Sequence, residues 1–354
     1  MVYKSVKPRS IVALIVAAVF VLGGVIVCSV SSSRAKAAGI MLFPEADDNG
    51  NLVYKMDLGT AVKVTVNTAD ADITIVGGAS ESYIEVVNFN ANYYKLSRSS
   101  ESVVFAQVDD FLSMFKFWEN GFSFKGMRYL LRFGDDIKND KQVIVHLSDS
   151  DNIRHIDAST DTGNIVLKDC LFAADYILKS TNGNISAADI SNSTSLSVSG
   201  STFDLSIDNL TTQKLSLTSD VQVTASLNNV TASEAIAKIS GGAFDLSAHD
   251  IGNLSITSES AEVKITDYNC DMADINTTSG DVSTFFKSVD SLAVSVITAK
   301  GKISENGVYV EKFSLNKENA AMRVNINTVD GDVVITYPED STTLTEKTDD
   351  KTEA

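Results

Sequence analysis

Proline is nearly absent from this chain, and its placement is informative. The chain has 354 residues and 3 prolines. None lies between Pro44 and Pro338, where a usage of about 5% would supply roughly fifteen. Because proline cannot donate to a β-ladder, it is kept out of interior strands. The proline-free stretch therefore favours one continuous β-ladder.

Residues that carry catalysis or bind metals are also scarce. The only histidines, His146, His155 and His249, lack metal-ligand spacing. Serine is plentiful, but the chain has no Gly-x-Ser-x-Gly elbow. Pairs of acidic residues are common, for example Asp135 with Asp136, but a chain with 46 Asp and Glu is expected to contain such pairs by chance. The sequence predicts no catalytic residue, no cofactor and no metal site.

Acidic residues outnumber basic residues, most strongly after the N-terminus. The chain has 29 Lys and Arg against 46 Asp and Glu, a net charge of −17 at pH 7, and its first basic residues precede an apolar run. The remainder is therefore even more acidic. Such a surface disfavours nucleic acid and anionic membranes as partners, and leaves cations, basic surfaces and neutral glycans.

A repeat occupies most of the sequence. The stretch "STDTGNIVLKDC" from Ser159 is echoed by "STNGNISAADI" from Ser180, and related stretches follow downstream. The first apolar residue after each turn recurs at a step of about 20 residues, typical of repeat architectures. These positions are Ile165, Ile185, Phe203, Val223, Phe244, Val263, Val282 and Ile303.

Each repeat contains two short runs in which apolar and polar residues alternate, separated by Ser, Thr, Gly, Asn and Asp. This pattern predicts two strands joined by tight turns. We therefore expect an all-β fold, a single-stranded-type β-solenoid over residues 60–337. Between Lys141 and Tyr337, about ten stacked coils would make a rod of about 48 Å. Cys170 and Cys270 would then lie about five coils apart, too far to form a disulfide.

The turns carry glycine followed by Asn or Asp, as in Gly163-Asn164 and Gly183-Asn184. Glycine supplies backbone freedom at a corner, and Asn or Asp hydrogen-bonds nearby backbone. A second polar corner recurs just before an apolar residue. Its members are Asp169, Asp189, Asn209, Asn229, Asp250 and Asp267. We interpret both corners as structural; a row of bound calcium ions is the alternative, although the nonapeptide pattern that builds such rows is missing.

The N-terminus differs from the repeat. An uncharged run from Ile11 to Val30 is long enough to cross a bilayer of about 30 Å. We expect a cytoplasmic tail over 1–9, a transmembrane anchor over 10–30 and a linker over 31–59, with the N-terminus inside because more basic residues precede the run than follow it. Cleavage after the small residues near Ala37 is the alternative.

One segment interrupts the repeat between residues 88 and 140, and a polar tail that we expect to be disordered follows at 338–354. The interruption is rich in aromatic residues, and part of it has helical spacing. It could cap the open end of the solenoid, lie on the membrane beside the anchor or bind a partner. The candidate interaction patch comprises Phe111, Phe115, Trp118 and Phe122.

The corners "TGNIVL", "NGNISA", "SGDVST" and "DGDVVI", the opening "AVKVTVNTADADITIVGG" from Ala61 and the anchor resemble the bacterial putative-adhesin family. The resemblance covers roughly residues 60–337. It implies a membrane-anchored β-strand-repeat solenoid of unknown function, without established catalytic residues to transfer.

These observations suggest three functions. The first is a non-enzymatic adhesin or scaffold that is anchored in the bacterial cell membrane, has its β domain outside, and binds a protein or glycan. The second is an envelope-associated accessory protein, for example in envelope stress, that contacts a membrane or wall partner through the aromatic segment. The third is a carbohydrate-active β-helix enzyme, which would need acids converging on one groove.

Overall fold

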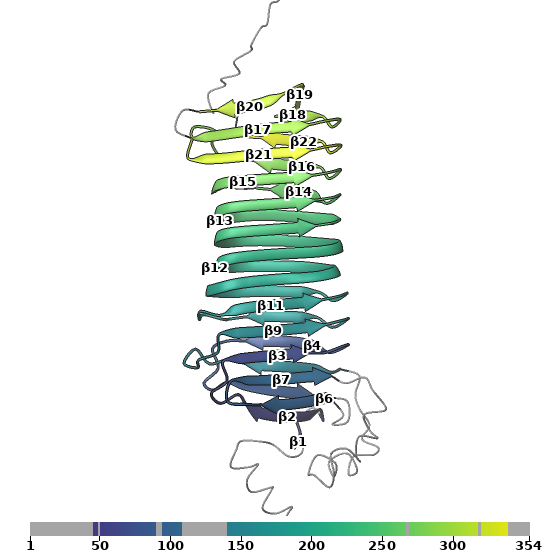
Figure 1. The fold of residues 1–354 in the computed structure, drawn as a ribbon, viewed down its shortest axis with the longest axis vertical. Coiled ribbons are helices and arrows are strands. Elements are labelled where there is room, and N and C mark those ends of the chain that lie inside the picture. Colours follow the sequence, from purple (N-terminus) through teal and green to yellow (C-terminus); the bar gives the residue numbers. More distant parts are fainter. Residues whose placement is uncertain are drawn as a thin grey trace, which may run out of the picture.

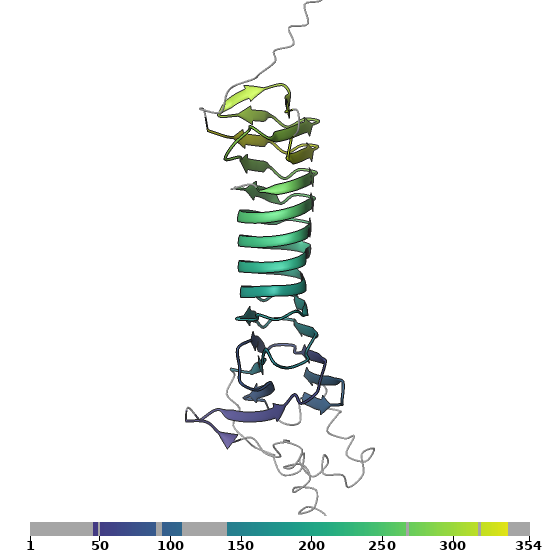
Figure 2. The same ribbon diagram turned by 90° about the vertical axis from the view of Figure 1, so that its left-hand side faces the viewer.

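The protein is a rod of stacked β-strands (Figure 1). The computed structural model describes residues 45–48, 50–89, 94–107, 140–266, 269–317 and 320–338, and within these ranges every regular element is a strand. Viewed from the side, the coils stack along a single axis (Figure 2). The expected all-β architecture is confirmed for these residues.

The strands divide into three groups along the rod. The N-terminal group contains β1 (Glu45–Ala46), β2 (Leu52–Asp57), β3 (Lys63–Asn67), β4 (Asp72–Val76), β5 (Tyr83–Val87), β6 (Tyr94–Arg98), β7 (Ser102–Gln107) and β8 (Gln142–His146). The middle group contains β9 (His155–Thr160), β10 (Ile165–Lys168), β11 (Asp175–Ser180), β12 (Ile185–Ile239), β13 (Gly242–Ser258), β14 (Glu262–Ile265), β15 (Cys270–Thr277) and β16 (Val282–Phe285). The C-terminal group contains β17 (Leu292–Thr298), β18 (Ile303–Glu305), β19 (Val308–Val310), β20 (Phe313–Asn316), β21 (Met322–Thr328) and β22 (Val333–Thr336).

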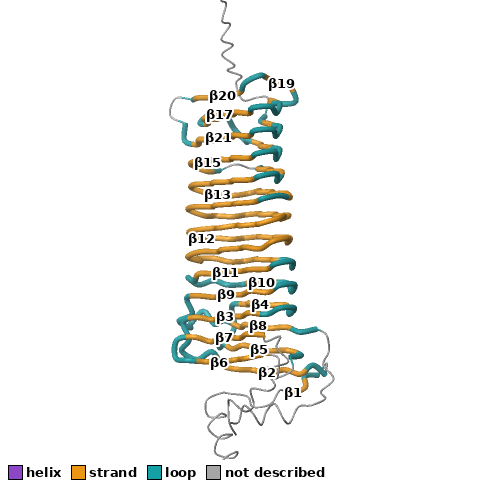
Figure 3. The backbone as a smooth tube through the Cα atoms, turned by 45° about the vertical axis from the view of Figure 1, so that its right-hand side comes forward, coloured by secondary structure: helices purple, strands orange, loops and turns teal. Residues whose placement is uncertain are grey.

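Each coil contributes one strand to each of two parallel ladders. Face 1 is the ladder of β7, β3, β9, β11, β15, β21 and β17, and face 2 is the ladder of β8, β4, β10, β14, β16, β22 and β18. The long strands β12 and β13 wind through both faces as a nearly continuous ribbon (Figure 3). The register Ile165↔Ile185 between β10 and β12 confirms the repeat of about 20 residues.

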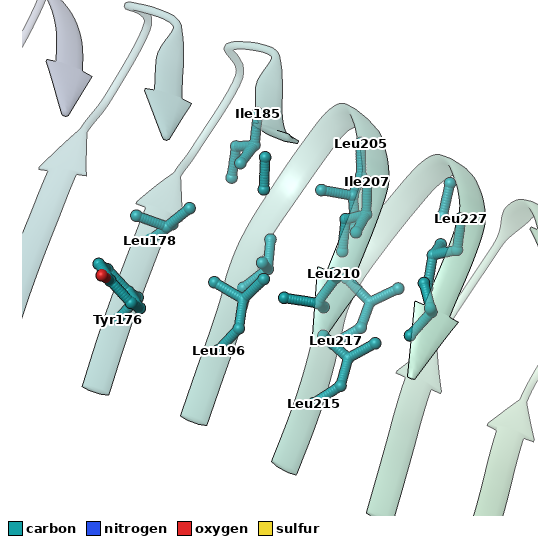
Figure 4. Close-up of a cluster of buried hydrophobic side chains, with 14 of the residues drawn as sticks. Tyr176, Leu178, Ile185, Leu196, Leu205, Ile207, Leu210, Leu215, Leu217 and Leu227 are labelled. Atoms are coloured by element: carbon teal, nitrogen blue, oxygen red, sulfur yellow. The ribbon is translucent and has the colours of Figure 1, made fainter. Parts of the chain in front are cut away.

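The core fills the space between the two faces. Period-two alternation turns Tyr176 and Leu178 inward from face 1, and Ile185 and Ala187 inward from face 2, and all four are buried. Figure 4 shows such side chains from successive coils pointing into one interior. Burial of one leucine side chain stabilises a fold by about 1.5–3 kcal/mol. Each coil therefore gains most of its stability by stacking on its neighbours.

The order of coils in space departs from the order in the chain at both ends. Near the N-terminus, the coil of β3 and β4 lies between the coil of β7 and β8 and that of β9 and β10. Near the C-terminus, the coil of β21 and β22 lies between that of β15 and β16 and that of β17 and β18. Figure 1 shows β21 between β15 and β17. The terminal repeats are thus inserted inside the stack.

Antiparallel strands cover the outermost coils. At the N-terminal end, β6 pairs with β7, β5 pairs with β8, and β2 pairs with β5. The rings of Phe89, Tyr94 and Phe105 pack together there, with centroids 5.2–5.8 Å apart. At the C-terminal end, β20 pairs with β17 and β19 pairs with β18. These strands cover the edges at which a bare parallel ladder would pair with other chains.

Two expected boundaries differ from the structure. The linker expected over 31–59 includes β2, whose side chains Tyr54 and Met56 are buried. The interruption expected over 88–140 includes β6 and β7, and β7 belongs to face 1. Both regions escape the 20-residue pattern because β2 and β6 run antiparallel to their neighbours instead of completing a coil.

Several expectations concern residues outside those that the structure describes. They are the cytoplasmic tail 1–9, the anchor 10–30 with its run from Ile11 to Val30, the tail from residue 339 onward, and the patch of Phe111, Phe115, Trp118 and Phe122. Among the described residues, no helix is long and apolar enough to span a bilayer.

Candidate functional site

The repeated turn between the two faces is held by a side-chain hydroxyl. The Gly183 amide donates to Ser180 Oγ at 2.7 Å, and the Gly163 amide donates to Thr160 Oγ1 at 3.0 Å. The same bond forms from Gly301 to Thr298 and from Gly331 to Thr328, each at 2.9 Å. All these hydroxyls satisfy backbone donors at the corner, as in Ser/Thr turns. The Ser/Thr-x-x-Gly signature is therefore structural.

Glycine is required at this turn for a different reason from the one expected. Gly163 and Gly183 do not have the left-handed backbone that glycine usually serves. A Cβ at Gly183 would instead lie 1.8 Å from the carbonyl oxygen of Gly163, and one at Gly163 would lie 2.0 Å from that of Ala71. The coils approach so closely at this corner that only glycine fits.

The polar corner residues bond to their counterparts in adjacent coils. The backbone amide of Asn184 donates to Asn164 Oδ1 at 3.0 Å. At the second corner, Asn209 donates to Asp189 at 2.9 Å and Asn229 donates to Asn209 at 2.6 Å. Asp169, Asp189, Asn209 and Asn229 all have φ between 52° and 57°, which Asn and Asp tolerate better than most residues. These ladders give the corner oxygens hydrogen-bond donors from the adjacent coil.

The titratable side chains do not converge on a reaction centre in the part of the chain that the structure describes. No three His, Cys, Asp or Glu side chains there lie close enough together to hold a metal ion. The three histidines belong to separate places, since His146 lies on β8, His155 on β9 and His249 on β13. His155 Nδ1 lies 3.1 Å from Asp175 Oδ2, a pair at the surface of face 1.

The two described cysteines are free and buried. Burial raises the pKa of each thiol, Cys170 and Cys270, to about 12. The reactive thiolate form is therefore disfavoured at neutral pH. The expectation that these cysteines do not pair is confirmed, and both act as small core residues.

A cluster of charged and aromatic side chains lies on the outer surface of β2, β5 and β8. Glu85 forms an ion pair with Lys55 and lies 3.6 Å from the His146 ring. His146 stacks on Tyr83 with ring centroids 4.2 Å apart. The hydrogen bond that Lys55 donates to Glu85 raises the pKa of Lys55 despite the opposing effect of burial. These contacts tie the antiparallel strands together at the N-terminal end.

The ends of the aromatic segment meet at one carboxylate. Gln107 Nε2 donates to Asp70 Oδ1, and Lys141 Nζ lies next to Asp70 Oδ2, each at 2.7 Å. The end of β7 and the start of β8 therefore lie close together at Asp70. The patch residues themselves lie outside the described part, so their placement stays a prediction.

The outer surface of face 1 is mostly flat and carries mainly polar side chains, with the isoleucines Ile177 and Ile297 exposed among them. On β12, Ser195, Ser197 and Ser199 point outward, beside Asp175, Ile177 and Lys179 of β11. Because neighbouring coils are in register, outward side chains form columns spaced by about 4.8 Å along the rod. Such columns offer hydroxyl and amide groups over the whole length of the face.

Face 1 becomes concave at its C-terminal end. Strand β20 lies against β17, and the chain then passes the start of β17 to enter β21. A groove of about 730 Å³ lies there, lined by residues of β15, β17, β20 and β21. The groove is open to solvent, so a bound molecule would keep one side exposed. Figure 3 labels these strands at one end of the rod.

The groove combines two cations with small polar and apolar side chains. Lys317 and Arg323 supply the positive charge, Ser295 and Asn316 supply hydroxyl and amide groups, and Ala293 supplies an apolar surface. The sequence analysis does not identify this site. Met272 and Arg323, for example, are neighbours only because β21 lies between β15 and β17.

Comparison with protein families identifies the repeat. The model of the Toastrack DUF4097 family, a domain of unknown function, matches residues 61–336. The chain belongs to the Toastrack DUF4097 family. This match agrees with the range over which the sequence resembles putative adhesins. No curated protein matches the chain.

The comparison with solved structures finds proteins of several bacteria. A protein of Bacteroides fragilis described as a putative adhesin is 8% identical, with a TM-score of 0.40 over 83% of this chain and 99% of that one. A Parabacteroides distasonis protein described as a putative lipid binding protein is 9% identical, with a TM-score of 0.40 over 82% and 98%. A putative cell adhesion protein of Clostridium sporogenes is 10% identical, with a TM-score of 0.19 over 81% and 99%.

Proposed function

We propose that this Toastrack protein is a non-enzymatic binding rod displayed at the bacterial cell surface. Its N-terminal run from Ile11 to Val30 anchors it in the membrane with the N-terminus inside, and the rod extends outward. Its ligand is a protein or glycan that contacts face 1. The family match, the anchor-like sequence and the rod shape support this proposal.

The flat outer surface of face 1 is the observation that carries the proposal. Its strands are in register from β9 through β15, and they present outward side chains at regular intervals, with serine, threonine or asparagine on most coils. A partner with repeated hydroxyl or amide groups could make the same contact at several coils, which increases the overall avidity. The described titratable groups, in contrast, are dispersed along the rod, which favours binding over catalysis.

Retention of the full-length protein by surface materials tests this function. The detergent-solubilised chain is offered purified cell wall, host matrix proteins and washed membranes, with and without calcium. The variant Ser197→Trp places a bulky ring on face 1, and Ser186→Trp places the same ring on face 2 of the same coil as the matched control. We expect Ser197→Trp to abolish retention by wall or matrix and Ser186→Trp to leave it intact.

A second candidate function, that of an envelope-associated accessory protein, rests on the aromatic segment between β7 and β8. Asp70 contacts Gln107 and Lys141, the described residues that flank the aromatic segment. An envelope-associated accessory protein would use that segment to contact a membrane or wall partner. Trp118→Ala in the same assay separates the two functions. Loss of all retention with Trp118→Ala but not with Ser197→Trp would favour the accessory role, and no retention of the wild-type chain by any material would refute the proposed binding function.

Membrane topology needs a separate measurement. Protease added to intact cells should remove a tag placed after Ala354 and spare a tag placed before Met1. Cleavage of the N-terminal tag, or protection of the C-terminal one, would contradict the proposed orientation.

A further inference from the structure

The groove at the C-terminal end of face 1 is the place where this flat surface gains depth. Ala293 and Ser295 of β17 form its floor beside Arg323 and Asn325 of β21. Strand β20 continues the floor, since Asn316 lies opposite Ala293 and Ser314 lies opposite Ser295. A molecule bound there would contact several strands simultaneously instead of one column of side chains.

The charge of the groove is opposite to that of the chain. The chain carries −17 at pH 7, yet Lys317 and Arg323 both line this groove. Within the described residues, neither side chain forms an ion pair with a carboxylate; exposed lysines such as Lys214 and Lys264, in contrast, do. Two cations without described counterions in an acidic protein suit an anionic group on a ligand. The planar guanidinium of arginine can bind a carboxylate through two parallel hydrogen bonds.

The remaining lining limits the class of ligand. Ser295, Ser314 and Asn316 offer hydroxyl and amide groups that match sugar hydroxyls. Ala293 and Met272 supply small apolar surfaces. The lining does not form the continuous apolar wall that an acyl chain would need, which disfavours a lipid. The neighbouring carboxylate of Asp274 accepts a hydrogen bond from Asn325 at 2.7 Å, so Asn325 lies between that carboxylate and Ser295 of the next strand.

We propose that this groove binds a carboxylate-bearing saccharide, with Arg323 and Lys317 at the carboxylate and the serine and asparagine side chains at the sugar hydroxyls. The inference extends the proposed function by naming a ligand class for face 1. It also makes the C-terminal end of the rod, opposite the end formed by β2 and β6, the end that contacts the ligand.

Calorimetric titration of the full-length protein in detergent micelles tests the proposal. The probes are trigalacturonate, its neutral methyl ester and triglutamate, which carries carboxylates without sugar rings. We expect trigalacturonate to bind at least tenfold more tightly than either of the other two. Its affinity should fall as salt rises, because a carboxylate in an open groove is screened.

Variants assign the binding to the groove. Arg323→Gln should weaken trigalacturonate binding at least tenfold, and Lys317→Gln should weaken it less. Lys238→Gln removes an exposed lysine from face 1 outside the groove and should leave the affinity unchanged. Ala293→Trp fills the floor without changing charge and should also abolish binding. An unchanged thermal unfolding midpoint in each variant shows that the rod stays folded.

Four results would overturn the proposal: triglutamate binding as tightly as trigalacturonate, the neutral ester binding equally well, Lys238→Gln weakening binding as much as Arg323→Gln, or no binding of any probe. Failure of the groove proposal is distinguishable from failure of the proposed binding function. If Arg323→Gln is still retained by cell wall and Ser197→Trp is not, face 1 binds a surface ligand and the groove is not its site.

Discussion

The middle of the rod and its two ends stack their coils in different ways. From β11 to β15 each coil lies on the one that precedes it in the chain. At both ends a terminal repeat is placed one layer inward, and antiparallel strands cover the outermost coil. The same repeat therefore produces a sequential stack in one region and an interlocked stack in the other.

The difference shows how a solenoid can protect its ends. A coil at the end of a sequential stack has a neighbour on only one side, so it opens first. Insertion of the β3–β4 and β21–β22 coils gives each of them neighbours on both sides. Stability in the middle depends on corners that repeat, whereas stability at the ends depends on pairing between segments distant in sequence.

The largest expected effect is an all-or-none crosslink that tests the interlocked C-terminal end. In the observed order, Asp274 lies beside Asn325 on the adjacent strand, and Ser295 lies one layer farther. Neighbouring strands are about 4.8 Å apart, within the Cα separation of about 7 Å that a disulfide permits. We expect Asp274→Cys with Asn325→Cys to form a disulfide on mild oxidation, detected by mobility on non-reducing gels.

The pair Asp274→Cys with Ser295→Cys is the matched control. Its Cα atoms would be about 9.6 Å apart, two strand spacings, so it should not crosslink. Crosslinking of this second pair in preference to the first would show that the C-terminal coils stack in chain order, and the comparison between middle and ends would fail.

Substitution of a corner glycine in the middle region should have the next largest effect, on the free energy of unfolding. Gly183→Ala would place a Cβ 1.8 Å from the carbonyl oxygen of Gly163, a backbone atom that cannot move independently. We expect the free energy of unfolding to fall by more than about 3 kcal/mol, measured by urea unfolding of the full-length chain, or the coils to fail to assemble.

Gly78→Ala serves as the control for loss of a glycine. Gly78 has φ of 73° and no atom within 4 Å of an added Cβ, so only backbone strain of about 1 kcal/mol is expected. Equal losses in the two variants would mean that close approach between coils is not what requires glycine at the repeated corner.

The smallest effect concerns the ionic contact at the N-terminal end. Burial raises the pKa of Asp70, but hydrogen bonds from Lys141 and Gln107 together lower it by more than burial raises it. The pKa of Asp70 therefore lies below the usual 3.8. A carboxyl group with a lowered pKa in the folded state stabilises the fold above its unfolded pKa, and this contribution is lost as pH falls through the folded value. Because both side chains are partly exposed, we expect less than about 1 kcal/mol.

The variant Lys141→Met should therefore reduce stability at pH 7 and have no effect at pH values well below 3.8, where Asp70 is protonated in the wild type too. Lys168→Met, at an exposed lysine of the middle region, should change little at either pH. Unfolding midpoints measured across this pH range provide the comparison. A penalty for Lys141→Met that persists at the acidic end would assign the loss to packing instead of charge.

Much of the fold could be predicted because its signals are local. The alternation of Tyr176 and Leu178 predicts a strand with one buried side. The recurrence from Ile165 to Ile185 predicts the register that the two strands adopt. The Asn and Asp corners follow from the same local chemistry, since these residues hydrogen-bond short stretches of backbone.

The rest depends on contacts between distant segments. Nothing near Met272 or Arg323 in the sequence indicates that they are neighbours. The same is true of β2, whose alternation around Tyr54 and Met56 is clear only once β5 is known to lie beside it. The groove could not be predicted because its lining residues are distant in the sequence. The need for glycine at Gly183 was explained wrongly for a similar reason: the steric clash that excludes other residues comes from the neighbouring coil.

The sequence alone determined that this protein is a β-solenoid with a 20-residue repeat and polar corners, because alternation and turn chemistry are set by residues close together in the chain. The tertiary structure decided which coil lies on which, how the ends are covered and where face 1 becomes concave. Coils with the same inward pattern present similar edges, so the local sequence pattern does not specify which coil lies on which. Only the strand pairing of the whole chain selects one stacking order.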